Sequence, residues 1–145
     1  MPHIFAQTMN LEPYISVTGI GPLFKLVTSK NNGLILQNIE DGKSKFYSVR
    51  RYQFTPLGTV AVYTLGGTIP LVEVMRSMQE KLASHPPVST KAEKHEIEEY
   101  FETILPDYDE DRVPIKDMKK IIKWFTFLKD RNLLDADQSA STEEE

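Results

Sequence analysis

Residues 59–82 read TVAVYTLGGTIPLVEVMRSMQEKL, and the spacing of the apolar residues changes within this stretch at Pro70. Before Pro70, Val60 and Val62 alternate with smaller or more polar neighbours, which is the two-residue period of a strand. After Pro70, the apolar residues recur at the spacing of one helix face. They are Leu71, Val74, Met75, Met78 and Leu82. The stretch therefore predicts strands before Pro70 and helices after it.

Short runs rich in β-branched and aromatic residues precede Pro70, and turn signals separate them. The runs are Leu23–Ser29, Leu34–Glu40, Lys43–Arg50 and Thr59–Leu65, and the turn signals are Asn32-Gly33, Asp41-Gly42 and Gly66-Gly67. Asn, Asp and Gly tolerate the positive φ of a tight hairpin turn, so the pattern predicts an antiparallel meander. Such a meander can hide its edges by closing. We expect a small SH3-like or Tudor-like β-barrel over residues 9–69, with an open sheet capped by helices as the alternative.

Three amphipathic stripes follow Pro70, so we expect a three-helix region over residues 70–134 and an α+β chain. The predicted helices are Leu71–Ala83, a second that starts near Thr90 and stops at Pro106, and a third from about Lys116 to Arg131. Thr90 and Glu93 have the spacing of a capping box. Residues 1–8 lie outside any predicted element, and the acidic tail at 135–145 is predicted to be disordered.

The composition excludes several kinds of protein. The chain has no cysteine, which excludes a disulfide framework, a thiolate zinc site and a cysteine nucleophile. No stretch approaches the roughly 20 apolar residues that span a bilayer, and Met1–Asn10 lacks the pattern of a signal peptide. We therefore expect a cytoplasmic protein without a membrane partner.

The net charge of −4 is unevenly distributed along the chain. Residues 1–69 carry six Lys and Arg against three Asp and Glu, whereas residues 70–145 carry eleven against eighteen. One interpretation is that the two halves have different solvated faces. The other is a mildly basic binding surface on the β half.

The segment from Lys43 to Phe54, KSKFYSVRRYQF, interleaves cations with aromatic residues. Such a mixture can neutralise phosphates while rings stack on bases. The alternative interpretation is a strand with aromatic residues inside and cations outside. The candidate binding residues are Lys43, Lys45, Tyr47, Arg50, Arg51 and Tyr52.

Asp107, Asp109 and Asp111 have the spacing that opens a calcium-binding loop. The rest of the loop departs from that pattern, because Arg112 stands where a Gly permits the sharp turn and Met118 stands where a bidentate Glu is required. A solvated loop between helices, or a helix cap, is the favoured interpretation. The histidines do not form a ligand set either, and no catalytic constellation is present, so no metal, cofactor or catalytic residue is predicted.

Several pieces of the chain resemble a family of uncharacterised proteins from Bacteroidetes bacteria. They are ISVTG at 15–19, LFKL at 23–26, VAVYT at 60–64 running into IPL at 69–71, and LPDYDEDRV at 105–113 with KKIIKW at 119–124. The resemblance covers residues 9–133 and implies a barrel-like N-terminal part joined to a helical C-terminal part. The family has no established activity, so it supplies no functional residues.

Three classes of function remain after these exclusions. The favoured one is a binding or adaptor protein whose small barrel engages a protein partner, because a surplus of three positive charges is small for a nucleic-acid binder. The alternatives are an RNA- or ribosome-associated module that uses Lys43–Phe54, and an enzyme or enzyme accessory with a site between the two halves. A homodimer is also compatible with the sequence.

Overall fold

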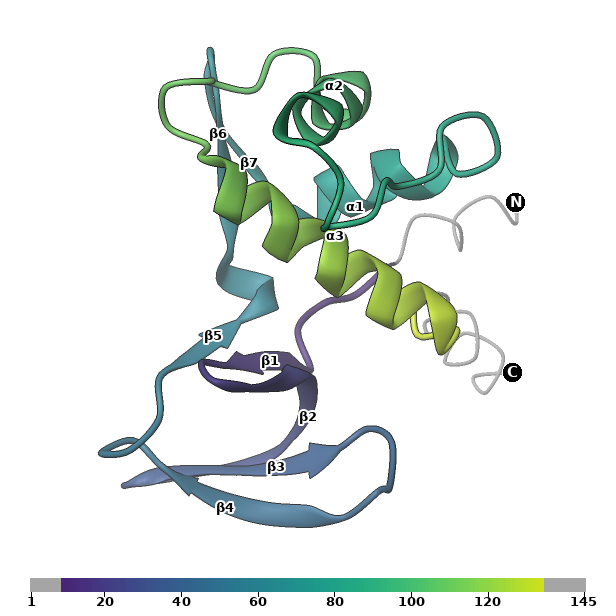
Figure 1. The fold of residues 1–145 in the computed structure, drawn as a ribbon. Helices are drawn as coiled ribbons and strands as arrows, with labels where there is room; N and C mark the ends of the chain where they lie inside the picture. The colour runs from purple at the N-terminus through teal and green to yellow at the C-terminus, as the bar shows by residue number, and fades with distance from the viewer. Residues whose placement is uncertain (1–8, 135–145) are drawn as a thin grey trace, which may run out of the picture. The chain divides into compact units, whose positions relative to one another are not determined.

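A computed structural model describes residues 9–134, which form two compact units. The sheet unit is Leu11–Val60, and the helical unit begins at Ala61 and also takes in Met9 and Asn10. The expected α+β class is confirmed, with a curled antiparallel sheet and three helices (Figure 1). The extension predicted at residues 1–8 and the disordered tail predicted at 135–145 lie outside the described residues.

The sheet unit is a five-stranded antiparallel sheet that curls into a half-barrel (Figure 1). Its strands lie side by side in the order β4-β3-β2-β1-β5. They are β1 (Tyr14–Val17), β2 (Ile20–Lys30), β3 (Gly33–Asn38), β4 (Ser44–Ser48) and β5 (Phe54–Pro56), followed by the 3₁₀ turn η2 (Leu57–Thr59). The register shifts once where β1 pairs with β2 and once where β2 pairs with β3. Irregularities of this kind increase the local twist and bend a sheet.

The two-residue period of the strands places one face of the sheet in a hydrophobic core. Leu36 is fully buried at the centre of β3, and its neighbours come from the strands on either side. The buried members of this core are Ile15, Val17, Phe24, Leu36 and Tyr47, with Ile20, Leu26, Leu34, Tyr52 and Phe54 packed against them.

The expected turns form, but not with the geometry that the dipeptides suggested. Lys30 pairs with Gly33, so the turn residues between β2 and β3 are Asn31 and Asn32. Neither asparagine has a positive φ, so this is not the positive-φ hairpin turn that the sequence predicted. Gly33 serves another purpose, because a Cβ at this position would lie 2.2 Å from the carbonyl oxygen of Tyr47. Gly42 does adopt a positive φ, of 74°.

The helical unit combines a hairpin with three helices. The hairpin consists of β6 (Ala61–Thr64) and β7 (Gly67–Pro70), and the helices are α1 (Leu71–Glu80), α2 (Lys94–Ile104) and α3 (Ile115–Asp130). The predicted helix stripes are buried, including Leu71, Val74, Met75 and Met78 of α1, Ile97, Tyr100, Phe101 and Ile104 of α2, and Met118, Ile121, Ile122, Phe125 and Leu128 of α3. Within the described residues, no helix is long and apolar enough to cross a membrane.

The hairpin belongs with the helices rather than with the five-stranded sheet. Both of its strands contact α1, and Thr64 forms a β-bridge with Tyr108. The compact units consequently divide between Val60 and Ala61, whereas the change of period had suggested a division between Ile69 and Pro70.

The second helix starts later than expected. It begins at Lys94, and its capping box is formed by Glu93 and Glu96 rather than by Thr90 and Glu93. The backbone N–H of Glu93 donates to a carboxylate oxygen of Glu96 at 3.2 Å. Residues 90–92 lie in a turn, because the N–H of Ala92 donates to the carbonyl of Ser89.

Candidate functional site

Strand β4 carries the centre of the predicted basic-aromatic segment. Lys45 pairs with Leu36 of β3 and Tyr47 pairs with Leu34, so both side chains lie on the core face of the sheet. The ammonium nitrogen of Lys45 lies 5.4 Å from the centroid of the Tyr47 ring, which is within the range of a cation–π contact. Lys45 is exposed and Tyr47 is 8% exposed, so the lysine covers the solvent side of a core ring.

Three aromatic rings form a row that leads from the core to the surface. The centroids of Phe24 and Tyr47 are 5.5 Å apart, and those of Tyr47 and Tyr52 are 5.3 Å apart in an edge-to-face arrangement. These are favourable ring geometries. Phe24 is 6% exposed, whereas Tyr52 is only half-buried. Tyr52 is therefore the member of the row that solvent or a ligand can reach.

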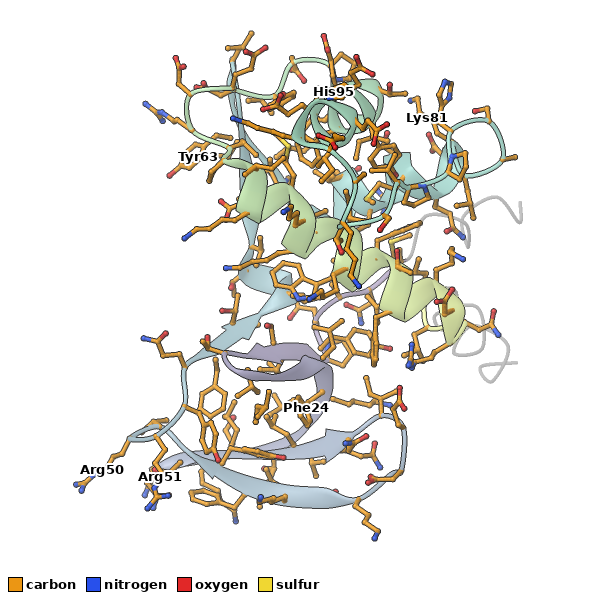
Figure 2. All side chains as sticks on the ribbon, viewed as in Figure 1. Phe24, Arg50, Arg51, Tyr63, Lys81 and His95 are labelled. Carbon is orange, nitrogen blue, oxygen red and sulfur yellow. The ribbon has the colours of Figure 1, made fainter. Side chains whose placement is uncertain are left out.

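The turn after β4 places two arginines beside Tyr52. The N–H groups of Arg51 and Tyr52 both donate to the carbonyl of Ser48 at 3.1 Å, and the N–H of Arg50 donates to the hydroxyl of Ser48 at 3.0 Å. The arginine side chains extend away from the sheet (Figure 2). Both are exposed, and the structure records no ion pair for either guanidinium within residues 9–134.

Lys43 lies apart from this group. It occupies the loop between β3 and β4, at the opposite end of β4 from the arginines, and its N–H donates to the Asp41 carboxylate at 2.8 Å. The structure thus links Lys45, Tyr47 and Tyr52 through successive ring contacts, and Arg50 and Arg51 lie in the same turn as Tyr52. We call this set, without Lys43, the aromatic–basic surface.

Two aromatic residues near this surface were not among the predicted binding residues. Phe24 enters the row because β2 and β4 both flank β3, a relation that the spacing of residues along the chain does not contain. Phe46 pairs with Ile35 on the opposite face of the sheet from Tyr47 and is 40% exposed. The aromatic residues of the segment thus divide between two faces.

The aspartates of the α2–α3 connection form a turn. A carboxylate oxygen of Asp109 accepts the N–H of Asp111 at 3.0 Å, and the other lies 3.8 Å from the guanidinium of Arg112. Asp107 offers its carbonyl to the N–H of Leu65. In the described part of the chain, no group of three or more His, Asp or Glu is arranged to hold a metal ion. The carboxylate of Asp109 thus acts locally as a turn cap.

Two tyrosines of the helical unit have shifted pKa values. Burial raises the pKa of Tyr100 to about 12. Burial also raises the pKa of Tyr108, and the carboxylates of Glu110, Glu98 and Glu102 add to that effect. Both phenols therefore stay protonated at neutral pH. The hydroxyl of Tyr100 is buried without a hydrogen-bond partner in the described residues.

The comparisons with known proteins agree with this division of the chain. Residues 60–128 match the family model of a domain of unknown function, DUF6852, and this match starts one residue before the helical unit. The chain is similar to a protein from Bacteroides vulgatus whose solution NMR structure was determined by the Northeast Structural Genomics Consortium. The similarity has a TM-score of 0.66 and a sequence identity of 31%, and it covers 82% of this chain and 85% of that chain. No curated protein matches the chain.

Proposed function

The chain belongs to the same family of uncharacterised proteins as the Bacteroides vulgatus protein, and we propose that it is a non-catalytic binding protein whose sheet unit is an SH3-like barrel that engages a protein partner. The strand order β4-β3-β2-β1-β5, with β1 paired to both β2 and β5, supports the barrel assignment. We also propose that the protein is bacterial and acts in the cytoplasm, as expected from the sequence. A fold of this kind hosts many functions, so the argument rests on the surface itself.

The observation that carries the proposal is the end of the aromatic row at Tyr52. This ring is half-buried, and its inner edge is held by Tyr47 at 5.3 Å. A partner that packs on Tyr52 consequently meets a ring that is already ordered, so little side-chain entropy is lost on binding. Tyr and Arg are also the residue types that are enriched at the energetic centres of protein interfaces.

The charges around Tyr52 indicate the chemistry of the partner. Arg50, Arg51 and Lys45 are exposed cations, and guanidinium groups bind carboxylates with paired hydrogen bonds. In addition, β4 lies at the edge of the sheet, where an extended peptide can add a strand. We therefore propose an extended peptide segment that carries carboxylates and an apolar side chain for Tyr52.

Binding of RNA through Lys43–Phe54 is the second candidate, and the four exposed cations of this segment favour it. Stacking along a nucleic-acid strand uses successive open ring faces, however, and on the face of Lys45 only the half-buried Tyr52 is within reach, because Tyr47 is 8% exposed. Phe46 is open, but it lies on the other face of the sheet from Lys45. The protein partner is consequently the better supported candidate.

A capture experiment from extract of the native cells, with and without nuclease, tests the proposal. We expect the wild-type chain to retain a protein partner after nuclease treatment, and Arg50→Glu/Arg51→Glu to lose it. The matched control is Lys25→Glu/Lys30→Glu, which makes the same charge change at exposed positions of β2 and should keep the partner. Loss of all partners after nuclease would favour RNA. Equal capture by the two double variants would refute the proposed surface.

A further inference from the structure

The helical unit exposes a second surface, formed where the α2–α3 connection runs beside the hairpin (Figure 1). Tyr63 of β6 is 44% exposed and Leu65, in the hairpin turn, is 76% exposed. The N–H of Leu65 donates to the carbonyl of Asp107 at 2.9 Å, and the N–H of Asp109 donates to the carbonyl of Tyr63 at 3.0 Å. These bonds hold the acidic connection against the exposed apolar residues. We call Tyr63 and Leu65, together with the acidic residues Asp107, Asp109, Glu110 and Asp111 of the connection, the hairpin surface.

Turn formation does not account for the exposed leucine. Two-residue hairpin turns favour Gly, Asn and Asp because of their backbone conformations, and a leucine adds nothing to that geometry. An exposed Leu by itself is common on protein surfaces. Here, however, Tyr63 lies two residues before Leu65 on the same hairpin, and the guanidinium of Arg112 lies 5.1 Å from the centroid of its ring, so an exposed ring and an arginine accompany the leucine.

The charge around this group is negative. Asp107, Glu110 and Asp111 are exposed in the connection, and Arg112 is the cation among them. The positive charge of that arginine is partly neutralised by the Asp109 carboxylate, which lies 3.8 Å from its guanidinium. Glu98 and Glu102 of α2 lie close enough to Tyr108 to raise its pKa, so they extend the negative field toward the same place. The aromatic–basic surface of the sheet unit has the opposite sign.

We propose that the hairpin surface docks a basic segment of a partner protein. An apolar side chain of that segment packs on Leu65 and Tyr63, while its lysines or arginines face the carboxylates of the connection. The complementarity of charge decides the kind of partner, because an acidic segment would be repelled. The surface is small, so the contact is weak. Its charges are exposed, so the contact also weakens as the salt concentration rises. This inference is independent of the function proposed for the sheet unit.

Fluorescence anisotropy with a labelled synthetic peptide of alternating Lys and Leu pairs tests the inference on the full chain. We expect binding at low salt, with affinity reduced about fivefold or more by Leu65→Ser because apolar burial is lost. Val49→Ser is the matched control, since Val49 is 54% exposed in the sheet unit, and it should leave the affinity unchanged. Glu110→Gln/Asp111→Asn should lower both the affinity and its salt dependence.

Each other outcome counts against the hairpin surface. A wild-type chain that does not bind the peptide would overturn the inference. So would an equal loss with Val49→Ser, or equal binding of a peptide with serines in place of the leucines, because charge alone would then explain the result. Light scattering that shows self-association through Leu65 would assign the surface to a second copy of the chain instead. Because Leu65 is exposed, circular dichroism of Leu65→Ser should match that of the wild type.

Discussion

Replacing Gly33 with alanine should damage the strand that carries the aromatic–basic surface. A Cβ at this position would lie 2.2 Å from the carbonyl oxygen of Tyr47 and 2.7 Å from the Cζ atom of Phe46. The ring of Phe46 can rotate away, but the carbonyl is part of the β4 backbone. Because Gly33 is paired with Ser48 in the β3–β4 ladder, the methyl group can be accommodated only if β4 moves away from β3.

The size of the destabilisation follows from the interactions that are lost when β4 moves away from β3. Loss of one or two ladder hydrogen bonds costs about 0.5–1.5 kcal/mol each. Loss of the contact of Phe46 across the strands costs a further ~0.2–1 kcal/mol. Alanine also lowers the entropy of the unfolded chain, which returns about 0.4–1 kcal/mol. We therefore expect Gly33→Ala to lower the free energy of unfolding by about 1–3 kcal/mol, within the range of measured single-residue effects.

Urea unfolding followed by circular dichroism measures this change, and Gly66→Ala is the matched control. Apart from its neighbours in the chain, no residue has an atom within 4 Å of a Cβ at Gly66, so that substitution should change the free energy of unfolding by less than about 1 kcal/mol. Amide hydrogen exchange in β4 should also become faster in Gly33→Ala. A change below about 0.5 kcal/mol for Gly33→Ala, or equal changes at the two glycines, would refute the argument from close approach.

Three further predictions concern the helical unit. Tyr100→Phe removes a buried hydroxyl that lacks a partner, so it should raise the free energy of unfolding by roughly 1 kcal/mol at pH 7. Because the folded-state pKa of Tyr100 is raised to about 12, the free energy of unfolding of the wild type should fall as pH rises from 10 to 12. Urea unfolding at a series of pH values should show a smaller fall for Tyr100→Phe. Asp109→Ala should lower the free energy of unfolding by about 1 kcal/mol, because the turn cap is lost. Scanning calorimetry should give the same difference between variant and wild type in millimolar calcium, and titration of the wild type with calcium should give no heat of binding. Glu93→Ala should lower the thermal midpoint through a cost of about 1 kcal/mol, while Thr90→Ala should have little effect, because the capping box starts at Glu93.

The helices could be predicted from the sequence because their signal is local. The stripe of α3 fixes a buried face, and the helix extends from Ile115 to Asp130 against a predicted Lys116 to Arg131. The start of α2 was wrong by about one turn. Both Thr90 and Glu93 have suitable side chains for a cap, and only the chain path before the helix decides which one is used.

The strand partners could not be predicted in the same way, and the candidate site depends on them. Lys45 and Tyr47 lie on one face of the sheet and Phe46 lies on the other, as the two-residue period of a strand requires. The contact between Phe24 and Tyr47 requires that β3 lie between β2 and β4, which is a long-range relation. The Asn32-Gly33 signal misled for a related reason. Gly33 is needed because a neighbouring backbone approaches closely, not because φ is positive.

The change of charge along the chain and the change of period at Pro70 do not locate a boundary independently of each other. Residues 61–69 carry no charged side chain, so the surplus of positive charge before the boundary is the same whether the boundary lies at 60 or at 69. The change of charge therefore could not test the position suggested by the change of period at Pro70. Strand pairing decides where the boundary lies. Strand β6 pairs with β7, and its residue Thr64 forms a bridge to Tyr108, which lies beyond α2 in the chain. The hairpin consequently brings Tyr63 and Leu65 to the acidic connection and gives the helical unit a surface that neither its period nor its charge predicted.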